Sequence, residues 1–488
     1  MKLTVKGGKR EIGPGERANR SILCLVYAVV FLFLCLMAYV GYFLTVDREH
    51  VINNAYNARL DGFAARVERG RILGSGGEIL AETRTGEDGR EIRNYPYGSL
   101  FAHGVGYSVR GKTGLEQLGN FYLLTSHENL LDQAIARLSG RKSRGDCLRT
   151  CFDVKLQQLA RDSLGEQNGA VIVMEPATGR ILAMVSSPDF NPNTVDQDWE
   201  SLVSEDNTEA QLLNRASQGL YPPGSVFKTV ILLEYIREHP DDYDQYRFDC
   251  TGYFQYEGYT IQCYHGNAHG SQDLSHAYAN SCNGAFASMG LELDLKGLGD
   301  TAGELLFNRD QPLAMAYSRS RFTLEEEDGD WQILQTAIGQ GLTLTTPMHI
   351  TMITAAVANK GVLMKPCLTD SVENAAGEKV KQFEPSVYGA LMTEKEAQIL
   401  TDMMELTVAE GTGSALRTES YTAAGKTGSA QFETGKETHS WFTGFAPAQD
   451  PQVVVTVVVE EGGSGGQTAA PIARSIFDAC ISGQKDVY

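Results

Sequence analysis

The stretch YPPGSVFKTVILL, residues 221–233, decides how the rest of the chain is interpreted. Two prolines and a glycine restrict the backbone that leads to Ser225. The apolar run that follows predicts a buried helix beginning at or just before this serine. Residues three apart on a helix are neighbours, so the amine of Lys228 is expected to reach the hydroxyl of Ser225. Burial lowers the pKa of a lysine, and a neutral amine can take the proton of a serine hydroxyl. The pattern therefore predicts a serine nucleophile that needs no histidine.

The Ser-x-x-Lys pattern alone is weak, because it occurs twice more, at Ser139 to Lys142 and at Ser482 to Lys485. The first copy lies in a basic, polar stretch and the second at the end of the chain, where disorder is usual. Neither opens a buried helix. An alternative interpretation of Ser225 is a helix-capping serine with a surface lysine one turn on. Other motifs have to decide between the two.

Composition bounds the class of protein. The 488 residues leave room for two or three domains, and 42% hydrophobic with 21% charged residues is typical of a globular protein. The formal net charge of −19 argues against a nucleic-acid partner.

Residues 22–44 contain no charged side chain and are long enough to cross a bilayer, so they are expected to form one transmembrane helix. Tyrosines at the far end are typical of an interfacial anchor, whereas a cleaved signal peptide, the alternative, has a shorter apolar core. Six Lys/Arg against two Glu in residues 1–20 predict that the tail, residues 1–21, is cytoplasmic. The chain is then a single-pass protein of the cell membrane with an extracytoplasmic catalytic domain.

Two extracytoplasmic domains are expected, residues 49–150 and 151–488. The first contains no nucleophile or acid/base pair, which favours a spacer or a partner-binding module. The second predicts an α+β fold, an antiparallel sheet flanked by helices. Its expected elements are a hairpin of 170–174 and 181–185, strands at 421–432, 440–445 and 453–459, and a closing helix at about 469–481.

Cysteines and histidines between residues 250 and 269 allow more than one interpretation. Cys250 and Cys263 bracket a Tyr/Gly-rich hairpin and can form a disulfide, a pairing that the sequence leaves open. His265 and His269 beside Cys263 suggest a metal, but no fourth ligand is near them in the sequence. Structural roles are therefore favoured, and no metal ligand is assigned.

Two further motifs follow Ser225 in the chain. Ser281-Cys282-Asn283 places a hydroxyl and an amide in one loop, and Lys426-Thr427-Gly428-Ser429 lies in a strand whose glycine permits close approach of a ligand. This set, in this order, resembles the penicillin-binding proteins and serine β-lactamases. Several other stretches look like class B penicillin-binding proteins, among them Asn214-Arg215-Ala216, Gly339-Gln340-Gly341 and residues 441–447. Arg69-Gly70 and residues 111–116 resemble the pedestal signatures of that class.

The resemblance implies a penicillin-binding/serine β-lactamase-like transpeptidase domain over 151–488, a pedestal domain over 49–150, and roles for individual residues. Ser225 would attack the D-Ala-D-Ala carbonyl of a peptidoglycan stem peptide, Lys228 would take the proton, and Ser281 would relay a proton to the leaving amine. Substrate binding would fall to Asn283, Lys426, Thr427, Gly428 and Ser429. No cofactor is expected.

The implied function is a serine-type peptidoglycan D,D-transpeptidase that cross-links stem peptides and binds β-lactams covalently. A D,D-carboxypeptidase or β-lactamase shares the three motifs but gives the acyl group to water, and a non-catalytic β-lactam sensor or scaffold is a third possibility. By the same resemblance, the pedestal and membrane helix are expected to contact a membrane-embedded glycan-strand polymerase. A role in elongation, division or sporulation is left open.

Overall fold

A computed structural model describes residues 14–43, 67–86, 89–129, 135, 138–433 and 435–482. The chain forms two compact units, Met1–Ala58 and Arg59–Tyr488. Residues 1–13 of the expected tail and residues 49–66 of the expected pedestal lie outside the described residues.

The first unit contains the helix α1, Pro14–Tyr42. Its segment Ile22–Tyr42 is 21 residues long and apolar, and none of it is buried inside the protein. A helix of that length is about 30 Å long, which matches the hydrocarbon thickness of a bilayer. By length and composition, this segment is a candidate membrane span, as the sequence predicts.

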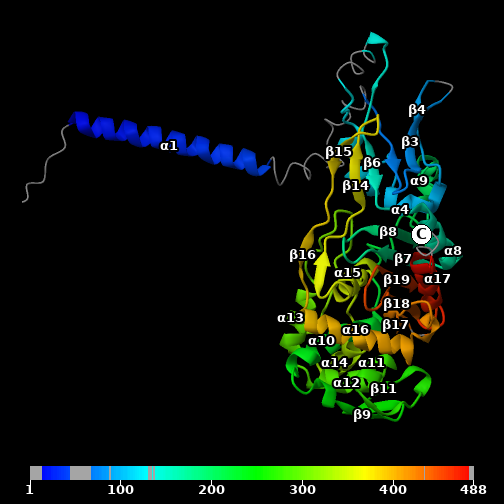
Figure 1. Cartoon of the computed structure of the whole chain (residues 1–488). Helices are drawn as coiled ribbons and strands as arrows, with labels where there is room; N and C mark the ends of the chain where they lie inside the picture. Colours follow the sequence, from blue (N-terminus) through cyan, green and yellow to red (C-terminus); the bar gives the residue numbers. More distant parts are fainter. Residues whose placement is uncertain are drawn as a thin grey trace, which may run out of the picture. The chain divides into compact units, whose positions relative to one another are not determined.

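A five-stranded antiparallel sheet forms the centre of the second unit (Figure 1), in the order β17-β18-β19-β7-β8. Its strands are β7 Gly169–Met174, β8 Ile181–Ser187, β17 Ala424–Ala430, β18 His439–Ala446 and β19 Val453–Val459. The expected hairpin and the three later strands are thus present. The strand expected at 421–432 is shorter than predicted, because β18 begins at His439, directly opposite Ala430.

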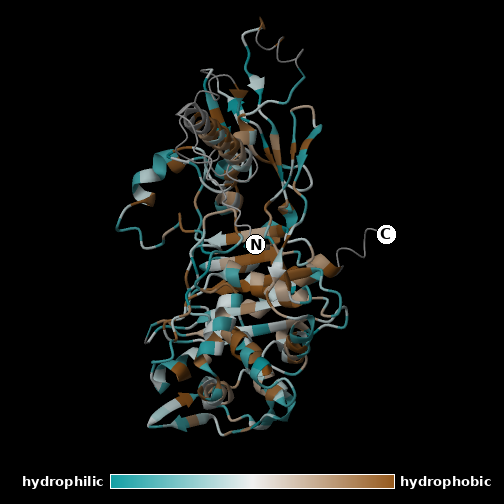
Figure 2. Cartoon of the chain, turned by 90° about the vertical axis from the view of Figure 1, so that its left-hand side faces the viewer, coloured by the Kyte–Doolittle hydropathy of each residue, from teal (hydrophilic) through white to brown (hydrophobic). Residues whose placement is uncertain are grey.

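Helices cover both faces of this sheet, which explains why every residue of β19, VVVTVVV, is buried. Val453, Val455 and Val457 pack with α8 Val154–Leu164 and α17 Ala469–Ser482, and Val454 packs with α15 Pro347–Ala358 on the opposite face. Figure 2 shows the hydrophobic residues concentrated in these central strands. The predicted α+β architecture is confirmed.

A mainly helical lobe lies on the side of the sheet where β17 forms the edge (Figure 1). Its helices are α10 Lys228–Glu238, preceded by the 3₁₀ turn η3 Gly224–Phe227, α11 Leu274–Ala279, α12 Asn283–Glu292, α13 Leu295–Glu304, α14 Asp330–Ala337 and α16 Glu394–Ala409. Two small hairpin-like sheets join it, β9 Arg247–Cys250 with β12 Gly270–Asp273, and β10 Tyr253–Tyr256 with β11 Tyr259–Gln262.

The pedestal is built on a six-stranded mixed sheet in the order β15-β14-β6-β2-β3-β4. Its strands are β2 Ile72–Leu73, β3 Ile79–Thr85, β4 Glu91–Asn94, β6 Cys147–Thr150, β14 Thr369–Glu373 and β15 Lys379–Gln382. The last two come from the segment that the sequence assigns to the transpeptidase domain. Arg149 on β6 holds Glu373 on β14 through two hydrogen bonds of 2.6 and 3.1 Å. The sheet therefore joins segments more than two hundred residues apart in the chain.

Shorter elements complete the second unit. They are β1 Val67–Glu68, β5 Ser143–Arg144, η2 Gly98–Phe101, α4 Ala102–Val105, α5 Gly114–Leu118, α6 Asn120–Leu123, α9 Val195–Leu202, η4 Tyr243–Gln245, η5 Tyr264–Gly266, β13 Val362–Met364, β16 Val387–Ala390 and η6 Ser414–Leu416.

A buried carboxylate holds the pedestal together. Glu116 is fully buried and accepts hydrogen bonds from Arg69 at 2.6 Å and from Arg93 at 2.7 Å. Burial by itself raises the pKa of Glu116, but the two guanidinium groups outweigh it and hold that pKa below its usual value. The two resemblance signatures, around residues 69 and 116, thus meet in one ion-pair network.

Replacing Glu116 by Ala is expected to destabilise the pedestal by about 3–5 kcal/mol, because it leaves two buried guanidinium groups without their counter-charge. Chemical denaturation of the full-length protein in detergent measures the effect. Asp300→Asn, which breaks the exposed pair with Lys296, is the control and should leave the midpoint unchanged. Equal midpoints for both variants would contradict this account.

Candidate active site

Ser225 lies in the 3₁₀ turn η3, which contacts β17 and is held through its backbone by the segment that follows α14. Gly224 donates its N–H to the carbonyl oxygen of Gly339 at 2.8 Å and adopts a φ of +55°. The N–H of Lys228 bonds the carbonyl oxygen of Ser225, and with three residues per turn these two side chains lie on the same face. Ser225 itself is half-buried. A 3₁₀ turn that passes into the α-helix at Lys228 therefore places the two residues one turn apart, and the contact of the amine with the Ser225 hydroxyl stays a prediction.

The amine of Lys228 is completely buried and fully hydrogen-bonded. Its Nζ donates to the carbonyl oxygen of Ser281 at 2.7 Å, to Oδ1 of Asn283 at 2.7 Å and to Oγ of Ser281 at 3.3 Å. Burial lowers the pKa of Lys228 to about 8, and the nearby Cys282 and Cys263 oppose that shift. A neutral amine is therefore accessible close to neutral pH.

The loop that carries Ser281 connects α11 to α12 through a strained turn. Ser281 has a φ of +54°, in the left-handed region, and its N–H donates to the carbonyl oxygen of Tyr278 at 3.0 Å. Cys282 caps α12 by accepting the N–H of Ala285 on its sulfur. Asn283 accepts from Lys228 and donates its Nδ2 to the carbonyl oxygen of Gln262 at 2.8 Å. The loop thus places three oxygen acceptors, from Ser281 and Asn283, on the buried lysine.

The strand β17 carries the second buried lysine and contacts η3. Lys426 is fully buried, donates to the carbonyl oxygen of Thr427 at 3.1 Å, and lies 5.4 Å from the ring centre of Tyr278. Burial, and secondly the charge of Lys228, lower the pKa of Lys426 well below its usual value. A Cβ added to Gly428 would lie only 3.2 Å from Cγ1 of Val226, so this glycine permits the contact between strand and turn.

The structure therefore brings the three predicted segments around one location. Ser225 and Lys228 contribute from η3 and α10, Ser281 and Asn283 from the α11–α12 loop, and residues 426–429 from the edge strand. Ser429 accepts the N–H of Gly465 on its hydroxyl at 3.3 Å. Of the other two Ser-x-x-Lys copies, the first has an exposed serine, Ser139, and the lysine of the second, Lys485, lies outside the described residues.

Sequence reasoning missed several residues that shape the site. Thr412 accepts a 2.6 Å hydrogen bond from the hydroxyl of Thr427, and the rings of Tyr278 and Phe286 lie 5.4 and 5.3 Å from the two lysine amines. No local pattern marks them, because Thr412 follows α16 and the aromatic residues resemble ordinary core positions.

The expectation that Cys263 and His269 have no fourth ligand nearby is wrong. Cys250, Cys263, His269 and Cys282 place their ligand atoms within 4.8 Å of one another. The fourth member comes from the active-site loop, thirteen residues beyond the histidine, and only folding brings it to the hairpins. His265, which the sequence also suggested, is not in this group.

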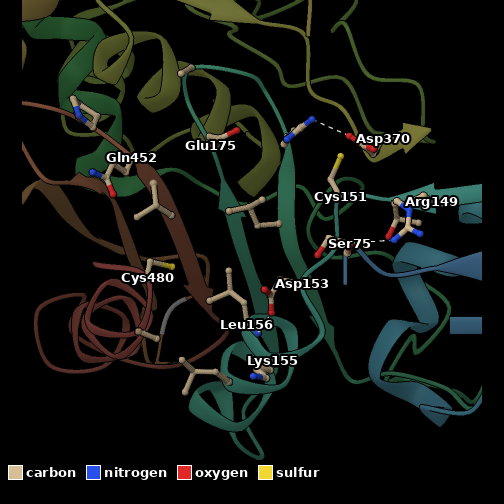
Figure 3. A pocket seen from close by; sticks show the side chains of 18 of the residues that line it. Ser75, Arg149, Cys151, Asp153, Lys155, Leu156, Glu175, Asp370, Gln452 and Cys480 are labelled. Atoms are coloured by element: carbon tan, nitrogen blue, oxygen red, sulfur yellow. Dashed lines mark hydrogen bonds and ion pairs between the residues drawn. The ribbon is translucent and has the colours of Figure 1, made fainter. Parts of the chain in front are cut away.

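A large cavity of about 1130 Å³ lies elsewhere, beside the junction of β6 and α8 (Figure 3). It is lined among others by Arg149, Asp153, Lys155, Glu175 and Asp370. None of the predicted site residues lines it, so its size does not identify the chemical site.

The fold agrees with comparisons to known proteins. The family model of the penicillin binding protein transpeptidase domain matches residues 169–478, more than half of the chain, and that of the penicillin binding protein A dimerisation domain matches residues 69–148. The chain belongs to the penicillin-binding proteins, and within them to class B.

Individual relatives are similar over most of their length. Peptidoglycan D,D-transpeptidase PbpA of Mycolicibacterium smegmatis is 31% identical over 85% of this chain and 89% of the relative. The crystal structure of a D,D-transpeptidase domain from Eggerthella lenta superposes with a TM-score of 0.78 at 30% identity, covering 86% of this chain and 100% of that one. A ceftriaxone acyl-enzyme complex of penicillin-binding protein A from M. tuberculosis has a TM-score of 0.77 at 28% identity, covering 86% and 99%.

Gly224→Ala is expected to destabilise the protein by more than Gly258→Ala. Both glycines have positive φ, so both variants carry the left-handed strain of about 1 kcal/mol. At position 224 the added Cβ would also lie 2.9 Å from the carbonyl oxygen of Ser429, whereas at 258 it meets nothing within 4 Å. Chemical denaturation of the two variants compares them directly. Equal losses would show that η3 and β17 are not in close contact.

Proposed function

We propose that this protein is a peptidoglycan D,D-transpeptidase that forms a serine acyl-enzyme on Ser225 and binds β-lactams covalently at the same residue. The observation that carries the proposal is the buried Lys228, which follows Ser225 by one 3₁₀ turn and whose amine donates a hydrogen bond to the Ser281 loop. Relatives named as D,D-transpeptidases and a neighbouring structure trapped as an acyl-enzyme support the same activity.

In the acylation step, Oγ of Ser225 bonds to the carbonyl carbon of the penultimate D-alanine while its proton passes to the neutral amine of Lys228. The bond to the terminal D-alanine then breaks, and Ser281 relays a proton to the leaving amine. The N-terminal end of the helix and the backbone N–H groups of Ser225 and Ser429 stabilise the oxyanion. An amine of a second stem peptide attacks the ester, which forms the cross-link and frees the serine.

Substrate recognition falls to the edge strand and the loop. β17 is the edge of its sheet, so its outer backbone groups are suited to pairing with an extended peptide. Lys426 and Thr427 bind the terminal carboxylate, whose charge offsets the burial of the lysine. Both ends of the Asn283 amide are already occupied by Lys228 and Gln262, so its contact with the substrate replaces one of these hydrogen bonds.

The first unit is proposed to attach the protein to the membrane. Ile22–Tyr42 anchors the protein as a single-pass span, with the basic N-terminal tail in the cytoplasm and the catalytic domain outside. Protease accessibility of the catalytic domain in intact cells measures this orientation. The pedestal, residues 49–150, and the membrane helix contact a membrane-embedded glycan-strand polymerase, and co-purification from detergent extracts measures that contact.

Ser225→Ala is expected to abolish covalent labelling by a fluorescent penicillin, because the variant has no oxygen nucleophile. Ser139→Ala is the matched control: it removes the serine of another Ser-x-x-Lys pattern and should label like the parent protein. Gel fluorescence measures both. Labelling that persists in Ser225→Ala would refute the nucleophile assignment.

Two parallel reactions of the unlabelled protein distinguish the rival activities: one with the fluorescent penicillin, and one with a donor stem peptide and a D-amino acid acceptor. A transpeptidase exchanges the terminal D-alanine for the acceptor and releases hydrolysed penicillin slowly. Rapid release of penicilloate indicates a β-lactamase, and hydrolysis of the donor without exchange indicates a carboxypeptidase. A protein that binds partners but labels with no penicillin is a scaffold.

The rate of penicillin acylation is expected to rise with pH and to level off above about pH 8, because only the neutral amine of Lys228 accepts the serine proton. The neutral fraction of a base with this pKa increases about fivefold between about pH 7 and pH 8. Stopped-flow measurements of the acylation rate at each pH test this dependence. Penicillin hydrolysis in buffer alone is followed in parallel as the control. Lys228→Arg, which stays charged, should show no such rise. A rate that falls through this range would assign the role to the charged lysine.

A further inference from the structure

Four side chains beside the active site form a compact group with the donor chemistry of a metal centre. Cys250 ends β9, Cys263 follows β11, His269 precedes β12 and Cys282 caps α12. Their ligand atoms all lie within 4.8 Å of one another. Three sulfur atoms and one imidazole nitrogen are a ligand set that structural zinc sites use.

The separations within the group match tetrahedral coordination. Sγ of Cys263 lies 3.7 Å from Sγ of Cys250 and 3.8 Å from Sγ of Cys282. A tetrahedral ion with zinc–sulfur bonds of about 2.3 Å places its sulfur ligands about 3.8 Å apart. Nδ1 of His269 lies 3.3 Å from Sγ of Cys250, close to the sulfur–nitrogen edge of about 3.6 Å for the same geometry. The remaining pairs of ligand atoms lie within 4.8 Å of each other.

The surroundings of the sulfur atoms are those of metal thiolates. All three cysteines are at most 3% exposed. The N–H of Gly252 donates to Sγ of Cys250 at 3.4 Å, and that of Ala285 to Sγ of Cys282 at 3.5 Å. Such backbone donors stabilise thiolate charge and orient the ligands.

The segment that carries three of these ligands has little other support. The strands β9 to β12 are exposed at most positions. Two small apolar clusters lie beneath them, one of Cys250, Cys263, Ala277, Cys282 and Ala285 and one of Ile261, Ala287 and Leu334. A lobe that buries so little apolar surface needs a cross-link for stability. Small domains usually have disulfides or a structural metal in this role.

We propose that Cys250, Cys263, His269 and Cys282 bind one zinc ion in a closed, structural site that fixes the active-site loop to the β9–β12 lobe. Three thiolates and a neutral imidazole hold the ion, and three protons are released on binding. With four protein ligands no coordination position is open, so the ion has no part in the acyl-transfer chemistry.

The site acts on the active site through Cys282. Its two neighbours, Ser281 and Asn283, supply all three acceptors of the Lys228 amine. Anchoring the sulfur of Cys282 therefore limits how far these acceptors move. The four ligands are positioning residues, and this effect on acylation rests on the proposed function, whereas zinc binding itself does not.

Zinc content of the full-length protein, purified in detergent without chelators, tests the site by elemental analysis. We expect about one zinc per chain in the parent protein and in Ser225→Ala, and a loss of most of it in His269→Ala and Cys282→Ser. Cys147→Ser, a cysteine outside the group, is the matched control and should keep the ion. Replacement by Co²⁺ should give the absorption bands of a tetrahedral thiolate site.

A chelator that removes zinc from the parent protein tests the site without substitutions, and so does not depend on whether the variants fold. The thermal midpoint should fall and return on adding zinc alone. Chelator-treated protein should acylate penicillin severalfold more slowly, and added zinc should restore the rate.

Parent protein without bound zinc or cobalt, or a Cys250–Cys263 disulfide found by mass spectrometry under non-reducing conditions, would overturn the metal site. Zinc present with an unchanged acylation rate after its removal would overturn the positioning effect alone. Zinc-loaded protein that reacts with no penicillin would leave the metal site standing and reject the proposed function.

Discussion

The hydrogen bonds of one buried amine organise this protein. Lys228 has no access to water, so its nitrogen has to be satisfied inside the protein or its burial costs several kcal/mol. All three of its acceptors come from Ser281 and Asn283, more than fifty residues further along the chain. The requirement to solvate the amine therefore fixes the α11–α12 loop against α10. The positive φ of Ser281 is the local conformational cost of that arrangement.

A second buried lysine adds an electrostatic conflict to the same site. The pKa of Lys426 falls through burial and, secondly, through the charge of Lys228. Tyr278 and Phe286 present ring faces to the two amines, which offsets only part of the desolvation. An anionic ligand relieves this conflict, which is consistent with the proposed binding of a substrate carboxylate beside Lys426. Selectivity for a carboxylate would then follow from the burial of positive charge.

The rest of the fold supports this arrangement from two sides. The central sheet is covered on both faces, so β17 is held rigidly at its edge and η3 packs against it through Gly428. On the other side of the site, the β9–β12 lobe reaches the loop through the hydrogen bond from Asn283 to Gln262 and through the cysteine group. The pedestal sheet incorporates β14 and β15, so its position depends on segments that follow α15 in the chain.

The sequence by itself determined what short segments encode. The apolar span that begins at Ile22, the β7–β8 hairpin, the valine-rich strand β19 and the order of the three motifs are local features or follow the order of the chain, so the sequence pattern predicts them directly. Only the tertiary structure decided which distant groups meet: Cys282 with the hairpin cysteines, β14 with β6, and Thr412 with Thr427. Such contacts depend on how elements pack around a shared core, and a one-dimensional pattern of polarity does not record the direction in which a loop or an edge strand turns once that core has formed.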